Sequence, residues 1–365
     1  MHISYPKNIL VIKFCCLGDI VFISPALRAL RASYPKARIT ILVSHWGAEL
    51  IPCLPMVDDV IVSDAPYEKS FWNKLISAVQ LIQKLRKLRP DIVFNTHRNS
   101  MFGLLAYLSG ARYRCGFTET RFLTHTSPFQ HSQYEVERYL SVLSAIGIHS
   151  ENTVTILQAP KQDYESVDRK LEALHISPEK DVIVIFPGGG ENVGTSMTIK
   201  RWYPERYVEL IRLIQGQTGG SIILVGGKED KSLCNQIASP CEGVINLAGE
   251  LSIREIVALG KRCRVFLGSD SGPTHMIAAT GAPTVALFGP TDPRLVAPRG
   301  KNQEYIWKQP ACSPCYTPQT VLQKQYYRGR TFICHTGTHE CIQSITVDQV
   351  WLILKKYLID SHENV

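Results

Sequence analysis

Residues 264–275, Arg-Val-Phe-Leu-Gly-Ser-Asp-Ser-Gly-Pro-Thr-His, carry the pattern that decides the fold. A short apolar run ends at Leu267, and small polar residues follow, with Ser271 or Gly272 suited to cap a helix. Pro273 then suits the first helical position, where a missing N–H leaves no bond unmade. The stretch therefore predicts a buried strand that turns into a helix, as in a parallel α/β sheet.

The same alternation of strand and helix runs through both halves of the chain. Buried strands are expected at 9–14, 38–43, 59–62, 91–94, 182–186, 221–225, 243–247, 264–267 and 284–288. Helices are expected at 20–33, 71–88, 164–174, 205–215, 253–261, 273–280 and 347–359. The pattern predicts an α/β protein of two doubly wound, Rossmann-like domains.

Changes in composition suggest where these domains begin and end. Residues 1–150 form the first expected domain and residues 181–345 the second, joined by a polar linker region at 151–180. Residues 346–365 are expected to form a helix that packs back across the domains. Because doubly wound sheets bind ligands at the carboxyl ends of their strands, two such domains that face each other would place a site in a cleft.

Composition and charge exclude several classes of protein. The chain has 365 residues, 45% of them hydrophobic and 20% charged, which excludes a collagen, a coiled coil and a disordered chain. Forty Lys and Arg against 32 Asp and Glu give a net charge of +8, which favours anionic partners. Lys13 interrupts the first apolar run after residue 12, so no signal peptide and a cytoplasmic location are expected.

The first candidate site residues follow the first strand, in the motif Phe-Cys-Cys-Leu-Gly-Asp at 14–19. Gly18 permits a tight turn where the backbone must approach a ligand, and Asp19 lies at a strand-to-helix corner expected to face the cleft. The alternative is that Asp19 only caps the helix. No G-x-G-x-x-G opens this helix, so a dinucleotide site is not expected.

A glycine-rich strand end at 186–190 opens the second group of candidates. The polar loop after it holds Thr195 and Ser196 and leads to the adjacent cations Lys200 and Arg201. The lysine ammonium is a point charge and the arginine guanidinium can form two parallel hydrogen bonds, and the two together suit a diphosphate. The alternative is a basic loop that is simply solvated. Asp230, after the next strand, is a candidate to bond ribose hydroxyls.

Residues after the strand at 264–267 add a third group at the same sheet edge. The N–H groups and positive dipole at the start of the following helix predict an anion site, where Gly272 allows close approach. The candidates here are Asp270, Ser271, Gly272, Thr274 and His275. The alternative for His275 is a buried histidine bonded to a carbonyl.

The order of these motifs resembles glycosyltransferase family 9, which contains the ADP-heptose:lipopolysaccharide heptosyltransferases. The resemblance spans nearly the whole chain and rests on Gly18-Asp19, Lys200-Arg201-Trp202, Gly226-Gly227, Asp270-Ser271-Gly272-Pro273-Thr274-His275 and Gly289-Pro290-Thr291. It implies a GT-B fold, with an N-terminal acceptor domain and a C-terminal nucleotide-sugar domain. It also implies an inverting transfer that needs neither metal nor cofactor.

The resemblance further implies a role for individual residues. Asp19 would be the general base, and Lys200 would meet the diphosphate. Asp230 or Glu229 would bind the ribose and Asp270 the transferred sugar, with phosphate contacts from Ser271 and Gly272. The expected reaction moves heptose from ADP-heptose to a lipopolysaccharide inner core or another glycolipid. The alternatives are a nucleotide-sugar epimerase, which would act without an acceptor, and a non-catalytic nucleotide- or glycan-binding module.

The basic helix at 71–88 raises the question of membrane contact. Its Leu75, Val79, Ile82 and Leu85 form an apolar face, expected to pack on the sheet with the lysines solvated. The alternative is peripheral contact with an anionic membrane, at the inner face of the cytoplasmic membrane. No nucleic-acid partner is expected.

Four cysteines near the C-terminus have the ligand type of a structural zinc site. They are Cys312, Cys315, Cys334 and Cys341. The uneven spacing of the second pair favours reduced thiols in a loop, with zinc as the alternative.

Overall fold

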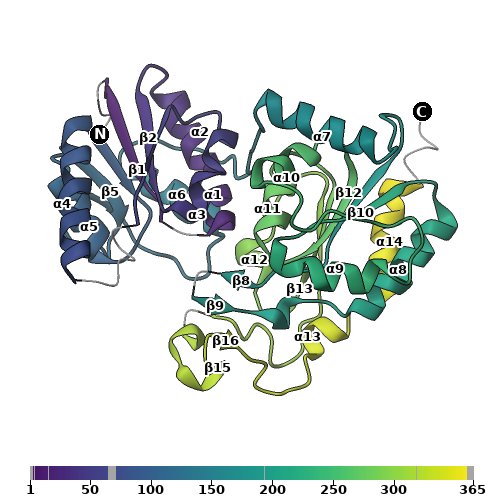
Figure 1. The fold of residues 1–365 in the computed structure, drawn as a ribbon. Helices are drawn as coiled ribbons and strands as arrows, with labels where there is room; N and C mark the ends of the chain where they lie inside the picture. Colours follow the sequence, from purple (N-terminus) through teal and green to yellow (C-terminus); the bar gives the residue numbers. More distant parts are fainter. Residues whose placement is uncertain are drawn as a thin grey trace. The chain divides into compact units, whose positions relative to one another are not determined.

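The structure is a computed structural model that describes residues 3, 5–14, 16–64, 71–192, 194–317 and 319–359, without the side chains of 71–74 and 191–192. Cys15 of the first motif lies outside the described residues. The chain divides into two compact units, Met1–Ile156 and Leu157–Val365. Each contains one six-stranded sheet, which confirms the prediction of two doubly wound α/β folds (Figure 1).

The sheet of the first unit has the strand order β3-β2-β1-β4-β5-β6, and neighbouring strands are parallel throughout. Its strands are β1 Asn8–Ile12, β2 Arg38–Val43, β3 Asp59–Val62, β4 Ile92–Asn95, β5 Tyr113–Phe117 and β6 His125–Ser127. The central strand β1 is an apolar run whose residues are almost all buried. The order reverses direction between β1 and β4, which is the point where such sheets bind ligands.

Helices cover both faces of this sheet (Figure 1). They are α1 Leu17–Phe22, α2 Ser24–Ser33, α3 His45–Ala48, η1 Ile51–Cys53, α4 Phe71–Leu88, α5 Ser100–Leu108 and α6 Glu135–Ser144. Helices α4 and α5 cover one face, where Leu85 and Phe102 pack with Leu10 and Ile12 of β1. Helices α2 and α6 contact each other on the other face.

Two expectations for these helices are wrong. The single helix expected at 20–33 is two helices, which meet at Ile23, because Pro25 lies at the start of α2 and lacks the N–H that a continuous helix would need. The apolar face expected on α4 is also misplaced. Leu85 is buried, but Leu75 and Val79 are exposed. No helix in the described part of the chain is both long and apolar enough to cross a membrane.

The second unit repeats the architecture of the first. Its sheet has the order β11-β10-β7-β12-β13-β14, again parallel. The strands are β7 Val182–Phe186, β10 Ser221–Leu224, β11 Ile245–Asn246, β12 Cys263–Ser269, β13 Thr284–Phe288 and β14 Gln303–Trp307. The order reverses between β7 and β12.

The helices of the second unit also form two layers (Figure 1). They are α7 Lys161–Ala173, η3 Thr198–Lys200, α8 Pro204–Gln217, η4 Lys228–Asp230, α9 Lys231–Ala238, α10 Ile253–Leu259, α11 Gly272–Ala278, α12 Pro293–Val296, α13 Glu340–Gln343 and α14 Val347–Leu358. Helix α7 packs on α10, and α14 packs on α8 and β12. The helix expected at 347–359 therefore belongs to the core of this unit, where Val350 and Leu354 are buried.

A small sheet of four strands adds a feature that the sequence pattern did not indicate. Its order is β15-β16-β9-β8, from Tyr327–Arg328, Thr331–Phe332, Thr195–Ser196 and Glu191–Asn192. The 3-10 helices η5 Thr320–Leu322 and η6 Lys324–Tyr326 precede β15. The small sheet joins the loop after β7 to a segment more than a hundred residues later in the chain.

Candidate active site

Asp19 lies at the switch point of the first sheet. Cys16 is the N-cap residue of α1, and Asp19 follows as the third residue of the helix, in its first turn. Gly18 beside it is partly buried. An acidic side chain in the first turn interacts favourably with the helix dipole. The side chain of Asp19 remains 31% exposed, so a ligand at this edge can reach it.

A buried lysine pairs with Asp19. Lys13 Nζ lies 3.3 Å from Asp19 Oδ1 and donates a hydrogen bond of 2.7 Å to the hydroxyl of Tyr139. That hydroxyl donates in turn to Glu135 Oε1 at 2.5 Å, and Arg138 forms an ion pair with Glu135. An ammonium buried without such partners would be strongly unfavourable, so the network stabilises the Lys13 charge.

His97 follows β4 on the other side of the same switch point. Its Nε2 accepts a hydrogen bond of 2.8 Å from the N–H of Phe14, which requires a neutral ring with its proton on Nδ1. Burial, and then the charge of Lys13, lower the pKa of His97 to about 3. His97 is therefore a fixed structural acceptor near Asp19 at neutral pH.

The second unit holds a more enclosed group of side chains. Lys200 Nζ donates to Asp270 Oδ2 at 2.6 Å, and the hydroxyl of Thr291 donates to the same oxygen at 2.5 Å. His275 Nε2 lies 3.4 Å from Asp270 Oδ1. Burial alone would raise the pKa of Asp270, but the charge of Lys200 and the hydrogen bond with His275 outweigh it and hold the pKa well below its usual range.

A glycine turn after β7 is held by Arg201 and Asp230. Arg201 Nε donates to the carbonyl of Gly189 at 2.9 Å, and its Nη2 lies 3.3 Å from Asp230 Oδ1. The Gly227 N–H donates to Asp230 Oδ2 at 3.1 Å. A Cβ at Gly188 would lie 2.1 Å from Asp230 Oδ1, so only glycine fits. Asp230 is buried, which raises its pKa, and its contacts organise the turn.

The remaining predicted residues belong to the second unit, and two of their hydroxyls are hydrogen-bonded to the backbone. The hydroxyls of Ser271 and Thr274 donate to the Ser269 carbonyl at 3.1 and 2.5 Å. Gly272 begins α11. Thr195 and Ser196 form β9, which pairs with β8 and β16.

Several site residues were missed from the sequence. Thr291 was expected only as part of the motif Gly289-Pro290-Thr291 and was given no role, although it follows shortly after the strand expected at 284–288. Lys13 could have been found as a lone charge at the end of an apolar strand. Tyr139 lies 126 residues from Lys13, so no local pattern of the sequence joins them. The same is true of Tyr316, whose ring centroid is 5.6 Å from Lys200 Nζ.

Three of the four cysteines considered as zinc ligands, Cys312, Cys315 and Cys334, lie between β14 and α13, and Cys341 lies in α13. Cys315 and Cys334 pack against a cluster formed by Met197, Ile199 and Phe332. Among the residues that the structure describes, no three His, Cys, Asp or Glu side chains are grouped so that they could hold a metal ion. Burial raises the pKa of Cys315 to about 11 and that of Cys341 to about 12.

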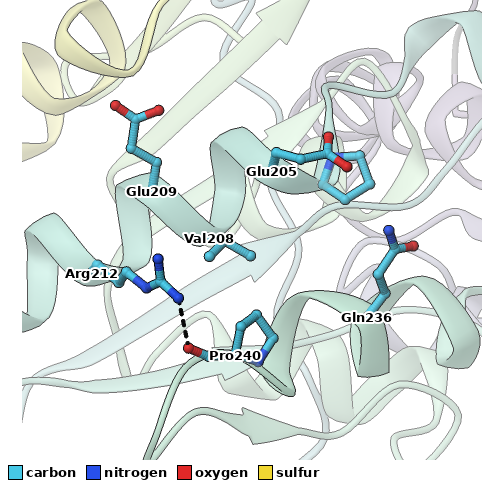
Figure 2. Close-up of a pocket in the computed structure, with 7 residues that line it drawn as sticks. Glu205, Val208, Glu209, Arg212, Gln236 and Pro240 are labelled. Carbon is cyan, nitrogen blue, oxygen red and sulfur yellow. Dashed lines mark hydrogen bonds between the residues drawn. The ribbon is translucent and has the colours of Figure 1, made fainter.

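A shallow pocket elsewhere in the second unit lies between α8 and α9 (Figure 2). Its lining includes Glu205, Val208, Gln236 and Pro240, whose carbonyl accepts a hydrogen bond from Arg212. None of the predicted donor-site residues contributes to it. The candidate residues therefore lie at the switch point of each sheet and not at this pocket.

A chain of two Rossmann-like units, each with a six-stranded parallel sheet and candidate residues at its switch point, has the GT-B fold of glycosyltransferases that use nucleotide sugars. The sequence profile of glycosyltransferase family 9 (heptosyltransferase) matches residues 78–326, more than half of the chain, so the chain belongs to that family. It is 26% identical over 302 residues to lipopolysaccharide heptosyltransferase 3 of Escherichia coli, covering 80% of this chain and 86% of the relative.

Two further comparisons cover more of the chain. Lipopolysaccharide heptosyltransferase 2 of Escherichia coli K12 is 26% identical over 357 residues, which is 94% of this chain and 96% of the relative. The solved structure of the ADP-heptose lipopolysaccharide heptosyltransferase II of Escherichia coli superposes with a TM-score of 0.75 at 22% identity. That match covers 98% of this chain and 100% of the other. The protein is a glycosyltransferase by family, and the structural match confirms its fold.

Proposed function

We propose that this enzyme transfers heptose from ADP-heptose to the inner core of a lipopolysaccharide or a related glycolipid. The names of its relatives, which are lipopolysaccharide heptosyltransferases, support this donor and this acceptor. The observation that carries the proposal is an aspartate–lysine pair at the switch point of each sheet, Asp19 with Lys13 and Asp270 with Lys200. Switch points are where doubly wound sheets bind their ligands.

Asp19 is the proposed general base. In an inverting transfer, the acceptor oxygen bonds to the anomeric carbon on the face opposite the leaving group, and its proton passes to the Asp19 carboxylate. The bond from the anomeric carbon to the diphosphate breaks, and its electron pair leaves on the phosphate oxygen. One carboxylate is enough for this chemistry, and the exposure of Asp19 suits contact with an acceptor.

Lys13 is proposed as a positioning residue for this base. Its ammonium lies 3.3 Å from Asp19 and favours the ionised carboxylate, the form that can accept a proton. Tyr139 holds the same ammonium from the other side. Because Lys13 is buried, it acts on the acceptor through Asp19.

Lys200 is the proposed electrostatic partner of the leaving diphosphate. Negative charge grows on the diphosphate as the sugar departs, and a fixed cation in a partly enclosed site stabilises that charge. Asp270, which accepts a hydrogen bond from Thr291, holds this cation. In this proposal the backbone N–H groups at the start of α11 add to the stabilisation of the diphosphate. In this proposal the chain's own groups supply the stabilisation that a divalent metal gives in other transferases.

The two candidates for the ribose contact, Asp230 and Glu229, differ in burial. Asp230 is buried and bonded to the glycine turn, whereas Glu229 is exposed. The Glu229 carboxylate lies over Gly227, where an added Cβ would be 2.3 Å from its Oε1. We therefore assign the ribose hydroxyls to Glu229, with Asp230 positioning the turn, and Asp270 remains the proposed contact for the transferred sugar.

The proposed setting is the cytoplasmic side of a membrane, since a glycolipid acceptor is anchored in a bilayer. In this proposal the first unit binds the acceptor and the second unit binds the donor.

The test is a donor screen. Purified protein is incubated with ADP-heptose or other nucleotide sugars, with and without a truncated core glycolipid, and release of nucleoside diphosphate is followed. We expect ADP release from ADP-heptose that requires the acceptor, and a glycolipid product whose new anomeric centre is inverted when examined by NMR. Release without acceptor, or a changed sugar still attached to its nucleotide, would show hydrolysis or epimerisation instead.

A further inference from the structure

The outer face of α4 and α5 carries an unusual number of exposed apolar side chains. We call it the α4–α5 patch, and its members are Leu75, Ile76, Val79, Met101, Leu104, Tyr107 and Phe122. Ile76 is 54% exposed and Tyr107 is 53% exposed. Contiguous apolar surfaces larger than a few hundred Å² are rare on monomeric proteins and mark sites of interaction.

The members of the patch come from neighbouring elements of one unit. Helices α4 and α5 contact each other and lie side by side on one face of the first sheet (Figure 1). Met101, Leu104 and Tyr107 recur every three residues, so they share one face of α5. The rings of Tyr107 and Phe122 lie 6.1 Å apart, which joins Phe122 to the α5 part of the patch.

The charged residues of the two helices have one sign. Helix α4 contains four cations and neither α4 nor α5 contains an acidic residue. Lys84, Arg86 and Lys87 are exposed on the C-terminal half of α4. The Arg114 guanidinium lies 5.4 Å from the centroid of the Tyr107 ring. Exposed aliphatic and aromatic side chains edged with lysine and arginine match the apolar and anionic layers of a lipid surface.

The patch is also continuous with the proposed acceptor edge of this unit. Helix α5 begins directly after the loop that holds His97, and the ring of Phe102 stacks on His97 at 4.1 Å. His97 accepts a hydrogen bond from Phe14, five residues before Asp19. A surface bound along α5 would therefore lie next to the edge at which Asp19 is exposed.

We propose that the α4–α5 patch docks the enzyme on the headgroup region of an anionic bilayer. The apolar side chains enter the boundary between headgroups and acyl chains, while the α4 cations bind lipid phosphates. This inference deepens the proposed function, on which it rests for the statement that the docked membrane carries the acceptor. The docking itself needs no acceptor, because the patch recognises the lipid surface.

The first experiment is sedimentation of the full-length protein with phospholipid vesicles. One set is phosphatidylcholine alone, and the other contains about 30 mol% phosphatidylglycerol, which gives it a negative surface potential. We expect binding to the anionic vesicles that falls at least about fivefold at ~0.5 M salt, where surface charges are screened. Equal binding to both sets, or no binding to either, would overturn the proposal.

Two variants test the two parts of the surface. Ile76→Glu places a charge in the apolar layer, and we expect vesicle affinity to fall at least about tenfold. Lys84→Glu with Lys87→Glu should reduce it by roughly fivefold or more for each cation. The matched controls are Leu352→Glu, at a side chain that is 63% exposed on α14, and Lys324→Glu on η6. Loss of binding in the controls as well would contradict the patch as the docking surface.

Two further measurements separate this inference from the proposed function and from self-association. Transfer to a short, detergent-free core oligosaccharide should be unchanged in Ile76→Glu, while transfer to vesicle-embedded glycolipid should fall with vesicle affinity. If wild-type protein binds vesicles but transfers no heptose, the proposed function fails and the docking surface stands. Light scattering that shows a dimer, converted to a monomer by Ile76→Glu, would instead assign the patch to a second copy of the chain.

Discussion

Each unit presents an aspartate paired with a lysine at the switch point of its sheet, but the two pairs differ in exposure. In the first unit the lysine is buried and the aspartate is 31% exposed. In the second unit both partners are nearly buried, and the Asp270 side chain is only 7% exposed. Asp270 receives hydrogen bonds from Lys200 and Thr291, at 2.6 and 2.5 Å, whereas the hydrogen bond from Lys13 to Asp19 is longer, at 3.3 Å.

The difference shows how one residue pair can serve two purposes. An exposed carboxylate held by a buried ammonium can exchange a proton with a bound hydroxyl. A buried carboxylate with several donors keeps its charge and fixes the cation beside it. We therefore expect chemistry to depend on Asp19 and positioning to depend on Asp270, and the following predictions test that division.

The largest effect is expected for Asp19→Asn. The amide keeps the shape of the side chain but cannot accept the acceptor proton, so kcat should fall by about 10³-fold. The affinity for ADP-heptose, measured by calorimetry, should stay within about twofold because Asp19 belongs to the other unit. The control is Asp64→Asn, an exposed carboxylate of the same unit that pairs with His45. Loss of donor affinity in Asp19→Asn would contradict its role as base.

A large effect is also expected at the second pair. Lys200→Met removes the cation, and kcat/KM should fall by about 10²-fold or more. Each single change, Lys200→Met or Asp270→Asn, leaves a buried charge without its partner, which costs on the order of 3 kcal/mol of unfolding free energy. The double variant should recover much of that stability but none of the activity. The free energies of unfolding of the wild type, the two single variants and the double variant are measured with denaturant. If the losses of the single variants add up to the loss of the double variant, the two residues are not coupled.

A smaller effect is expected for Lys13→Met. Without the ammonium, Asp19 is less strongly held in its ionised form, so the acidic limb of the kcat/KM profile against pH should move to higher pH. At neutral pH, kcat should fall by about tenfold. Tyr139→Phe removes only the second contact of Lys13 and should produce a shift in the same direction but smaller. A uniform loss of activity with no shift would indicate a purely structural role.

The smallest effect concerns acid stability. His97 has a pKa lowered to about 3, whereas an unfolded histidine titrates near 6.5. Below about pH 6.5 the unfolded chain therefore binds a proton that the folded chain does not bind, and stability falls as the pH decreases, by about 1.4 kcal/mol per pH unit at most. In the second unit, burial opposes ionisation of Glu255, but contacts with Lys170, Ser166 and Ser252 lower its pKa to about 2. The stability that the ionised Glu255 contributes to the folded state is therefore lost only below about pH 4.5.

Hydrogen exchange between pH 7 and 5 distinguishes the two units in one sample. Amides of β1 and β4 should lose protection before those of β7 and β12, after correction for the intrinsic pH dependence of exchange. His97→Gln keeps an acceptor for the Phe14 N–H and should flatten the response of the first unit alone. Equal loss in both units would contradict the assignment to His97.

Much of this fold follows from the sequence because buried parallel strands are short apolar runs. The strands at 38–43, 59–62, 182–186 and 284–288 have the predicted limits, and α4 has the predicted limits of 71–88. Two strands were missed. In β5, Arg and Gly interrupt the apolar run, and β14 begins with polar residues and is only partly buried. The small sheet consists of two-residue strands, which leave no periodic pattern.

The site was predictable only where it depends on local sequence. Lys200 and Asp270 follow strand ends, so their types and positions predicted a shared sheet edge, but not that they bond each other. Asp230 shows the limit of such reasoning. It lies at the predicted edge, but its carboxylate is turned into the glycine turn after β7, a contact between residues 41 apart that no local pattern contains.

The small sheet implies an order of assembly during synthesis. The loop with Lys200 is held by residues made much later, because Ser196 bonds Arg330, and Trp202 and Arg206 both bond the Ile345 carbonyl. A ribosome-bound chain that ends before these residues has the glycine turn without the contacts that fix its cation. The newly made polypeptide can therefore order the loop that holds Lys200 only after residue 345 has been made.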